Sequence, residues 1–314
     1  MERVTAMWIY YVLAALLLLI VLLSAFMFRK AFYRPAVQDM SRSGALEHSA
    51  LFGYTPLLRP AIEWLKERPA EDVWIQSEDG APLHGLWYAG KKKIAFVMFH
   101  GYASSPFNDF CLAARWAIQR GYSVLLADER GHGQSGGVCT TLGIAESMDC
   151  CLWAEKADAR SDHAKIVLMG LGMGGTAALL SAGKGLPESV VAIVADSAYS
   201  SVKGQLEYTM KHRYNLRRFP LLPLFSLYAR LFWKDGFDAP DILTVLKENR
   251  IPMFFAHGKL DLTVPYSECE TLYAACAAEK RLFCGENAGH GACSLAETER
   301  YYSELQAFLR ENLK

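Results

Sequence analysis

The 314-residue sequence lacks three features that assign many chains to a functional class: an excess of one charge, paired cysteine motifs and internal repeats. Lysine plus arginine equals aspartate plus glutamate at 33 each, and no basic run is longer than Lys91 to Lys93, which argues against nucleic-acid binding. The eight cysteines form no C-x-x-C pair and lie mostly in apolar runs, which argues against a disulfide framework and a zinc site and fits a reducing compartment. We interpret the adjacent Cys150 and Cys151 as helix residues rather than as a redox pair. A small or apolar partner is therefore expected.

An uncharged apolar segment extends from Val4 to Phe28. It is long enough to cross a bilayer as a helix, which needs about 20 residues. Aromatic residues lie at both ends of the run, as they do at membrane interfaces: Trp8, Tyr10, Tyr11, Phe26, Phe28, Phe32 and Tyr33. A cleaved signal peptide is the alternative, but its apolar region is shorter and ends in a small-residue cleavage site, which is not seen here. We predict an uncleaved single-pass anchor over residues 1–34, with membrane contact through residues 7–28.

The basic residues beside this segment predict its orientation. Arg3 precedes it, whereas Arg29, Lys30 and Arg34 follow it. Because positively charged flanks stay on the cytoplasmic side, the large domain is expected in the cytoplasm.

The rest of the chain, 52% hydrophobic overall, predicts one large α/β core. A connector over residues 35–70, with a helix around 57–67, precedes a domain over residues 71–314. EDVWIQS and PLHGLWYAG predict a hairpin. Apolar strands are predicted at 94–99, 123–128, 165–170, 190–196, 252–257 and 281–285, and helices at 107–120, 143–159, 173–184, 266–278 and 296–313. Uniformly apolar strands alternating with helices predict a mostly parallel, doubly wound sheet.

Residues 199–248 interrupt this alternation, because they are more than a βαβ crossover needs. The segment LLPLFSLYARLFW predicts a helical lid over the carboxyl ends of the strands. An ordinary insertion packed on the core is one alternative. Another is a surface that rests on anionic lipid, since the segment is bracketed by basic residues: Lys211, Arg213, Arg217, Arg218 and Lys234.

Residues 166–175, IVLMGLGMGG, have the frame of the G-x-S-x-G turn that presents a catalytic serine between a strand and a helix. The apex of this frame is Gly172, which has no side chain to attack a carbonyl, so no acyl-enzyme can form there. Glycine adopts the strained apex geometry more easily than serine does. A natural loss of the nucleophile and a deliberate replacement predict the same residue.

Five stretches in register carry a family resemblance: FHGYASS (99–105), DERGHGQSGG (128–137), GLGMGG (170–175), HGKLDLTVP (257–265) and NAGHG (287–291). With them the chain resembles the α/β-hydrolases, and within that superfamily it is similar to the serine aminopeptidase-like and Bem46-like hydrolases. The resemblance covers residues 71–313. It implies hydrolysis of an ester or amide, with no metal and no organic cofactor, because the family's mechanism uses only side chains and backbone amides.

The resemblance also assigns roles to individual residues. His290 matches the general base, Asp261 matches the carboxylate that orients it, and Gly172 stands at the nucleophile position. The backbone amides of Tyr102 and Met173 match the oxyanion hole, which survives replacement of side chains. The remaining polar residues of the motifs are expected to be structural: His100, Asp128, Arg130 and His132.

Other groups replace the missing serine poorly. Cys293, Ser104 and Ser105 lack the strand-to-helix presentation that aims a nucleophile. A water activated by His290 is chemically sensible, although general-base help supplies only about 10² to 10⁴ in rate. The sequence therefore predicts a membrane-anchored member of a serine hydrolase lineage with lost or strongly reduced activity. A non-catalytic module that binds a small ester, amide or lipid-like ligand and an interaction protein at the membrane surface are the alternatives.

Overall fold

The computed structural model describes residues 2–34, 51–162, 164–234, 236–238 and 241–313. Residues 35–50, the first part of the predicted connector, lie outside the described residues. The rest of the connector contains a short 3₁₀ turn, Phe52–Tyr54, and helix α2, Thr55–Lys66, close to the predicted helix.

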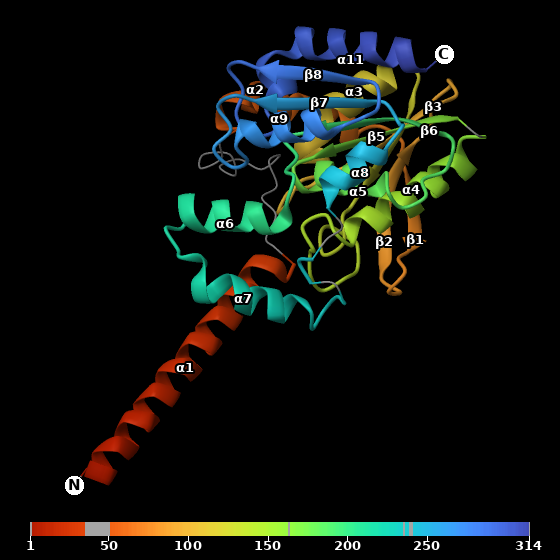
Figure 1. The fold of residues 1–314 in the computed structure, drawn as a ribbon. Helices are drawn as coiled ribbons and strands as arrows, with labels where there is room; N and C mark the ends of the chain where they lie inside the picture. Colours follow the sequence, from red (N-terminus) through yellow and green to blue (C-terminus); the bar gives the residue numbers. More distant parts are fainter. Residues whose placement is uncertain (1, 35–50, 163, 235, 239–240, 314) are drawn as a thin grey trace.

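An eight-stranded sheet forms the centre of the domain, in the order β1-β2-β4-β3-β5-β6-β7-β8 (Figure 1). β1 and β2 form the predicted hairpin, β2 also pairs antiparallel with β4, and all other neighbours are parallel. The strand bounds are β1 Glu71–Gln76, β2 Pro82–Tyr88, β3 Ile94–Phe99, β4 Ser123–Ala127, β5 Lys165–Leu171, β6 Val190–Asp196, β7 Met253–Gly258 and β8 Lys280–Gly285. The predicted mostly parallel, doubly wound sheet is confirmed.

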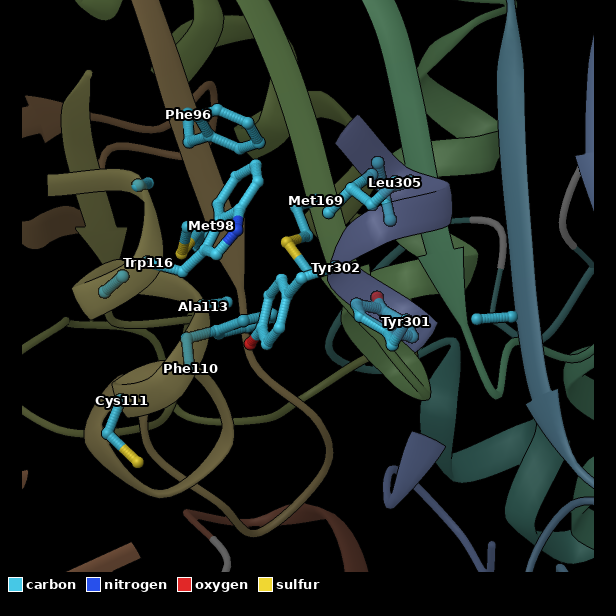
Figure 2. Packing of buried hydrophobic residues seen from close by; sticks show 14 of the residues in the cluster. Phe96, Met98, Phe110, Cys111, Ala113, Trp116, Met169, Tyr301, Tyr302 and Leu305 are labelled. Carbon is cyan, nitrogen blue, oxygen red and sulfur yellow. The ribbon is translucent and has the colours of Figure 1, made fainter. Parts of the chain in front are cut away.

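Helices cover both faces of the sheet, which is why its central strands are mostly apolar. Along β3, Phe96 and Met98 contribute to the core on one face, while Val97 and Phe99 contribute to the core on the other. The first face is covered by α2, α3 (Pro106–Gln119) and α11 (Thr298–Asn312). Figure 2 shows part of this packing, in which the Trp116 ring stacks on Tyr302 with centroids 5.3 Å apart.

The second face is covered by α4 (Glu146–Arg160), α5 (Met173–Ser181), α8 (Ile242–Glu248) and α9 (Tyr266–Ala275). Two helices of the predicted lid lie away from the sheet: α6 (Val202–His212) and α7 (Arg218–Ala229) (Figure 1). In contrast, α8 at the end of that predicted range packs into the core, because Ile242 and Leu246 are buried there.

Helix α1, Glu2–Phe32, projects from the domain (Figure 1). Its segment Met7–Phe32 is long and apolar enough to cross a membrane, and most of it is not buried against the domain. Its last turns pack on the domain, mainly against α7, and Ala31 also accepts a hydrogen bond from Tyr102. Phe28 and Phe32, which we expected as interfacial aromatics, are buried, at 4% and 2% exposed, among aromatic rings of α7 and the residues that follow it.

Candidate active site

The predicted site residues lie in loops at one edge of the sheet. Tyr102 follows β3, Gly172 follows β5, Asp261 follows β7 and His290 follows β8. These strands run parallel, so their carboxyl ends open at the same edge, where α/β sheets bind ligands. The sheet order therefore brings together residues that are up to 188 positions apart in the sequence.

The turn between β5 and α5 is held by close backbone approach. A Cβ atom on Gly170 would lie 2.2 Å from the Gly174 carbonyl oxygen, and one on Gly174 would lie 2.1 Å from the Phe99 carbonyl oxygen. Such distances exclude any side chain at these two positions. The turn thus requires glycine on both sides of its apex.

Gly172 at the apex has a different environment. Its backbone angles, φ 54° and ψ −112°, are strained for a residue with a side chain. A Cβ atom there would meet only the His290 imidazole within 4 Å, with Nε2 at 3.2 Å and Cε1 at 3.4 Å. The His290 Nε2 atom therefore borders the space beside the apex. In serine hydrolases, the corresponding imidazole nitrogen faces the nucleophile.

His290 is held from its other side by Asp261. Its Nδ1 lies 2.8 Å from Asp261 Oδ2, and its side chain is 25% exposed. Burial alone would lower the pKa of His290, but the hydrogen bond and the charge of Asp261 raise it above its usual 6.5. The imidazole is thus oriented with Nε2 toward Gly172 and is more basic than a free histidine.

Asp261 is a fully buried carboxylate with several donors. Its Oδ1 accepts hydrogen bonds from the backbone amides of Thr263, at 2.7 Å, and Val264, at 2.9 Å. Burial by itself raises the pKa of Asp261, but hydrogen bonds from His257 and His290 lower it well below its usual range. The carboxylate therefore stays ionised and can stabilise a charged imidazole.

His257 was missed at the sequence level, where it was treated only as part of the motif HGKLD. Its Nε2 lies 3.2 Å from Asp261 Oδ2 and 3.0 Å from the Val264 carbonyl oxygen, and its side chain is fully buried. It supports the carboxylate from the end of β7. The sequence feature that could have predicted this contact is the position of His257 four residues before Asp261.

The two predicted oxyanion donors also lie at this edge. Met173 is the first residue of α5, so its amide has no partner within the helix, and Tyr102 follows the β3 turn. Within the described part of the chain, neither amide donates to another residue. Both amides lie at the edge of the sheet where Gly172 lies, and unpaired amides are groups that can bind a negatively charged oxygen.

Asp109, which the sequence did not single out, fixes the loop after β3. Its Oδ2 accepts from the Gly101 amide at 2.7 Å, and its Oδ1 accepts from the Ser104 hydroxyl at 2.5 Å. Burial raises the pKa of Asp109. Ser105 caps α3 by accepting from the Asn108 amide. Both serines thus have structural partners.

The other polar motif residues form hydrogen bonds around the site. His100 accepts from the Glu129 amide at 3.1 Å, and burial lowers its pKa to about 3, so it is neutral. Arg130 forms two hydrogen bonds with Asp149, at 2.6 and 2.7 Å. His132 accepts from the Ala103 amide at 3.1 Å and Asp128 contacts His84 at 2.8 Å.

Cysteine and metal chemistry find little support in this geometry. All eight cysteines are free thiols, and Cys293 is fully buried, which raises its pKa strongly. Among the described residues, no group of three or more histidine, cysteine, aspartate or glutamate side chains is placed to hold a metal ion.

Comparisons with known proteins match this architecture. A family model described as serine aminopeptidase, S33, matches residues 90–219. YqkD of Bacillus subtilis, an uncharacterized protein, is 31% identical over 195 residues, which cover 61% of this chain and 63% of YqkD. The chain thus spans less than two thirds of that relative. The uncharacterized membrane protein YNL320W of Saccharomyces cerevisiae is 26% identical over 52% of this chain and 53% of its own length.

Solved structures extend the likeness of fold. The Pyrococcus furiosus esterase Pf2001 superimposes with a TM-score of 0.65 and 24% identity, covering 78% of this chain and 93% of the esterase. At this identity the match concerns the fold.

Proposed function

The chain belongs to the α/β-hydrolase superfamily, and from that premise we propose that it is a membrane-anchored member whose site is arranged to transfer an acyl group from an ester or amide to water. Gly172 occupies the nucleophile position. Hydrolysis through an acyl-enzyme is therefore lost, and any remaining turnover is slow.

The proposal assigns one role to each group of the site. His290 is the general base, Asp261 holds its tautomer and stabilises its charged form, and the Tyr102 and Met173 amides bind the developing oxyanion. Gly172 contributes no atom to the reaction. A water held beside Gly172 can still lose its proton to His290 Nε2, which supplies about 10² to 10⁴ in rate.

One observation carries the proposal: a Cβ atom at Gly172 would lie 3.2 Å from His290 Nε2, whose ring is bonded to Asp261 at 2.8 Å. A serine hydroxyl at this position reaches hydrogen-bonding distance after a shift of a few tenths of an ångström. This geometry supports a base that could act on a nucleophile at position 172, which the chain does not have.

The test compares the full chain with Gly172→Ser on a short p-nitrophenyl ester, in the same detergent or nanodisc. We expect the serine variant to show a burst and at least about 10³-fold faster turnover, because loss of a triad nucleophile costs on the order of 10⁶. Gly172→Ala is the matched control, since it adds the same backbone strain without a hydroxyl.

Two results would contradict the proposal. A folded serine variant without a burst means that the His290 and Asp261 pair does not act on position 172. Rapid labelling of the unmodified chain by a fluorophosphonate means that another nucleophile operates.

A second candidate function is ligand binding without turnover. The unpaired Tyr102 and Met173 amides and the raised pKa of His290 together favour an anionic group such as a carboxylate. Calorimetry with decanoate tests this candidate, with about tenfold weaker binding expected for His290→Ala. Equal binding by the variant and the unmodified chain excludes the site as the receptor.

We also assign α1 as a membrane anchor with the large domain in the cytoplasm, on the charge distribution around the helix. An impermeant maleimide tests the orientation, with Glu155→Cys as its target on the exposed surface of α4. Labelling only after cell lysis supports the assignment, whereas labelling in intact cells reverses it.

A further inference from the structure

The outward side of α7 and the turn after it exposes an unusual amount of apolar surface. We call this the α7 apolar face and define it as Phe219, Leu227, Leu231 and Phe232, which are 78%, 56%, 75% and 48% exposed. The opposite side of α7 is buried through Leu222, Phe225 and Ala229. A helix that is apolar on both sides is not typical of one that faces water, and several large exposed apolar side chains on one segment indicate an interaction surface.

The α7 apolar face lies beside the membrane-spanning segment of α1. The Tyr228 hydroxyl lies 3.1 Å from the Val21 carbonyl oxygen and 2.8 Å from the Ser24 hydroxyl. The rings of Phe28 and Phe232 stack with centroids 5.9 Å apart. Figure 1 shows α7 crossing the end of α1, while the rest of α1 projects away from the domain.

The length of α1 fixes the depth of this contact. The apolar run begins at Val4, after the charged residues Glu2 and Arg3. At 1.5 Å per residue, the helix from Val4 to Val21 is only about 26 Å long, and a hydrocarbon core is about 30 Å thick. A tilted helix needs still more residues to span it. The boundary of the hydrocarbon core must therefore lie beyond Val21, at the level where α7 is attached.

Charged residues at both ends of α7 fit this depth. Arg217 precedes the helix, Arg218 is its first residue, Arg230 and Lys234 follow it, and all four are exposed. Arg218 pairs with Glu207 and Arg230 pairs with Asp238. Helices that lie in the interface plane combine an apolar face with flanking basic residues in this way.

We propose that α7 is a second membrane contact, lying in the headgroup layer of the bilayer that α1 spans, with its apolar face directed toward the acyl chains. The inference rests on the proposed anchor. It explains why an exposed apolar face is continuous with the anchor helix. It also places the turn at Gly172 near the membrane surface. Met173, the residue after Gly172, shares one buried cluster with Phe225 of α7 and with Phe28 and Phe32 of α1.

Depth-dependent quenching in nanodiscs tests this placement with the full chain. The background is Cys284→Ser, since the other seven cysteines are buried. A fluorophore is attached at Leu227→Cys or Leu231→Cys, with Leu19→Cys in α1 as the membrane control and Glu155→Cys in α4 as the solvent control. We expect lipids that carry a doxyl group near the headgroup to quench the labels at 227 and 231 at least threefold more than the label at 155.

Three outcomes overturn the proposal, and they differ in what else they affect. If the label at 19 is quenched while those at 227 and 231 behave like the label at 155, α7 lies in water and the anchor stands. If the label at 19 is not quenched, the anchor fails and the inference fails with it. If the labels at 227 and 231 are shielded from aqueous iodide but not quenched by lipid, a second copy of the chain or another protein covers the face.

Discussion

The two sides of the site differ in how strongly they are held. On one side, Asp261 receives hydrogen bonds from two backbone amides and from the imidazoles of His257 and His290. The bond from His290 also fixes the orientation of the His290 ring. On the other side, a side chain added at the apex residue Gly172 would contact only the His290 ring. The acid and base side is a connected, buried network, and the nucleophile side is an open position on a strained turn.

This difference teaches that a glycine at the proposed nucleophile position need not disturb the groups that surround it. The turn is determined by Gly170 and Gly174, whose missing side chains allow β3, β5 and α5 to approach. The apex itself makes no packing contribution. Stability therefore depends on the flanking glycines, whereas chemistry depends on the apex.

The largest effect is expected on turnover, when His290 is replaced in a chain that carries serine at position 172. In the Gly172→Ser background, His290→Gln should lower kcat by on the order of 10⁶-fold, because the hydroxyl loses its base. In the unmodified chain, the same change should alter the slow turnover by no more than about 10² to 10⁴, the range of general-base help to water. Parallel ester assays measure both. Equal losses in the two backgrounds would show that His290 does not act on position 172.

The next effect separates the apex from its flanks by stability. Gly174→Ala places a methyl group 2.1 Å from the Phe99 carbonyl oxygen, so roughly 3 kcal/mol of destabilisation or failure to fold is expected. Gly172→Ala meets only a movable imidazole and should cost about 1 kcal/mol of backbone strain. Urea unfolding in matched detergent measures both. Similar losses for the two variants would remove the distinction between apex and flank.

The positions of Asp261 and His290 were predictable, because both lie in short motifs that resemble those of the α/β-hydrolases. Each strand is an apolar run, and each site residue comes directly after one, so the sheet order carries Asp261 and His290 to the edge where Gly172 lies. The support given by His257 and Asp109 was not predictable, since it depends on which way buried side chains point.

The packing of the anchor on the domain was also beyond the sequence. Phe28 and Phe32 read equally well as interfacial aromatics and as packing residues, and only the fold shows that α7 covers them. Arg34, counted as a flanking charge, in addition donates to backbone carbonyls of the Gly133–Gly137 loop. Such contacts join residues about a hundred positions apart, which local periodicity does not encode.

A smaller effect is expected from pH. His290 must be neutral to accept a proton, and its pKa is raised above 6.5, so kcat/KM of Gly172→Ser should fall about tenfold per unit of pH below an inflection that lies above 6.5. Asp261→Asn removes the charge that raises this pKa and should move the inflection to lower pH. A pH profile measured from 5.5 to 9 checks both. An inflection that Asp261→Asn leaves in place would show that the carboxylate does not control the imidazole.

The smallest effect concerns the point where the anchor meets the site. The Tyr102 hydroxyl donates to the Ala31 carbonyl oxygen at 2.5 Å, whereas the oxyanion role that we propose belongs to the Tyr102 backbone amide. Tyr102→Phe should thus lower stability by about 1 kcal/mol, the net worth of one hydrogen bond, and change turnover of the Gly172→Ser variant less than about threefold. Unfolding and ester assays on the double variant measure the two quantities. A loss of turnover beyond tenfold with unchanged stability would mean that the anchor positions the oxyanion loop, and the two sides of the site would then have to be considered together with α1.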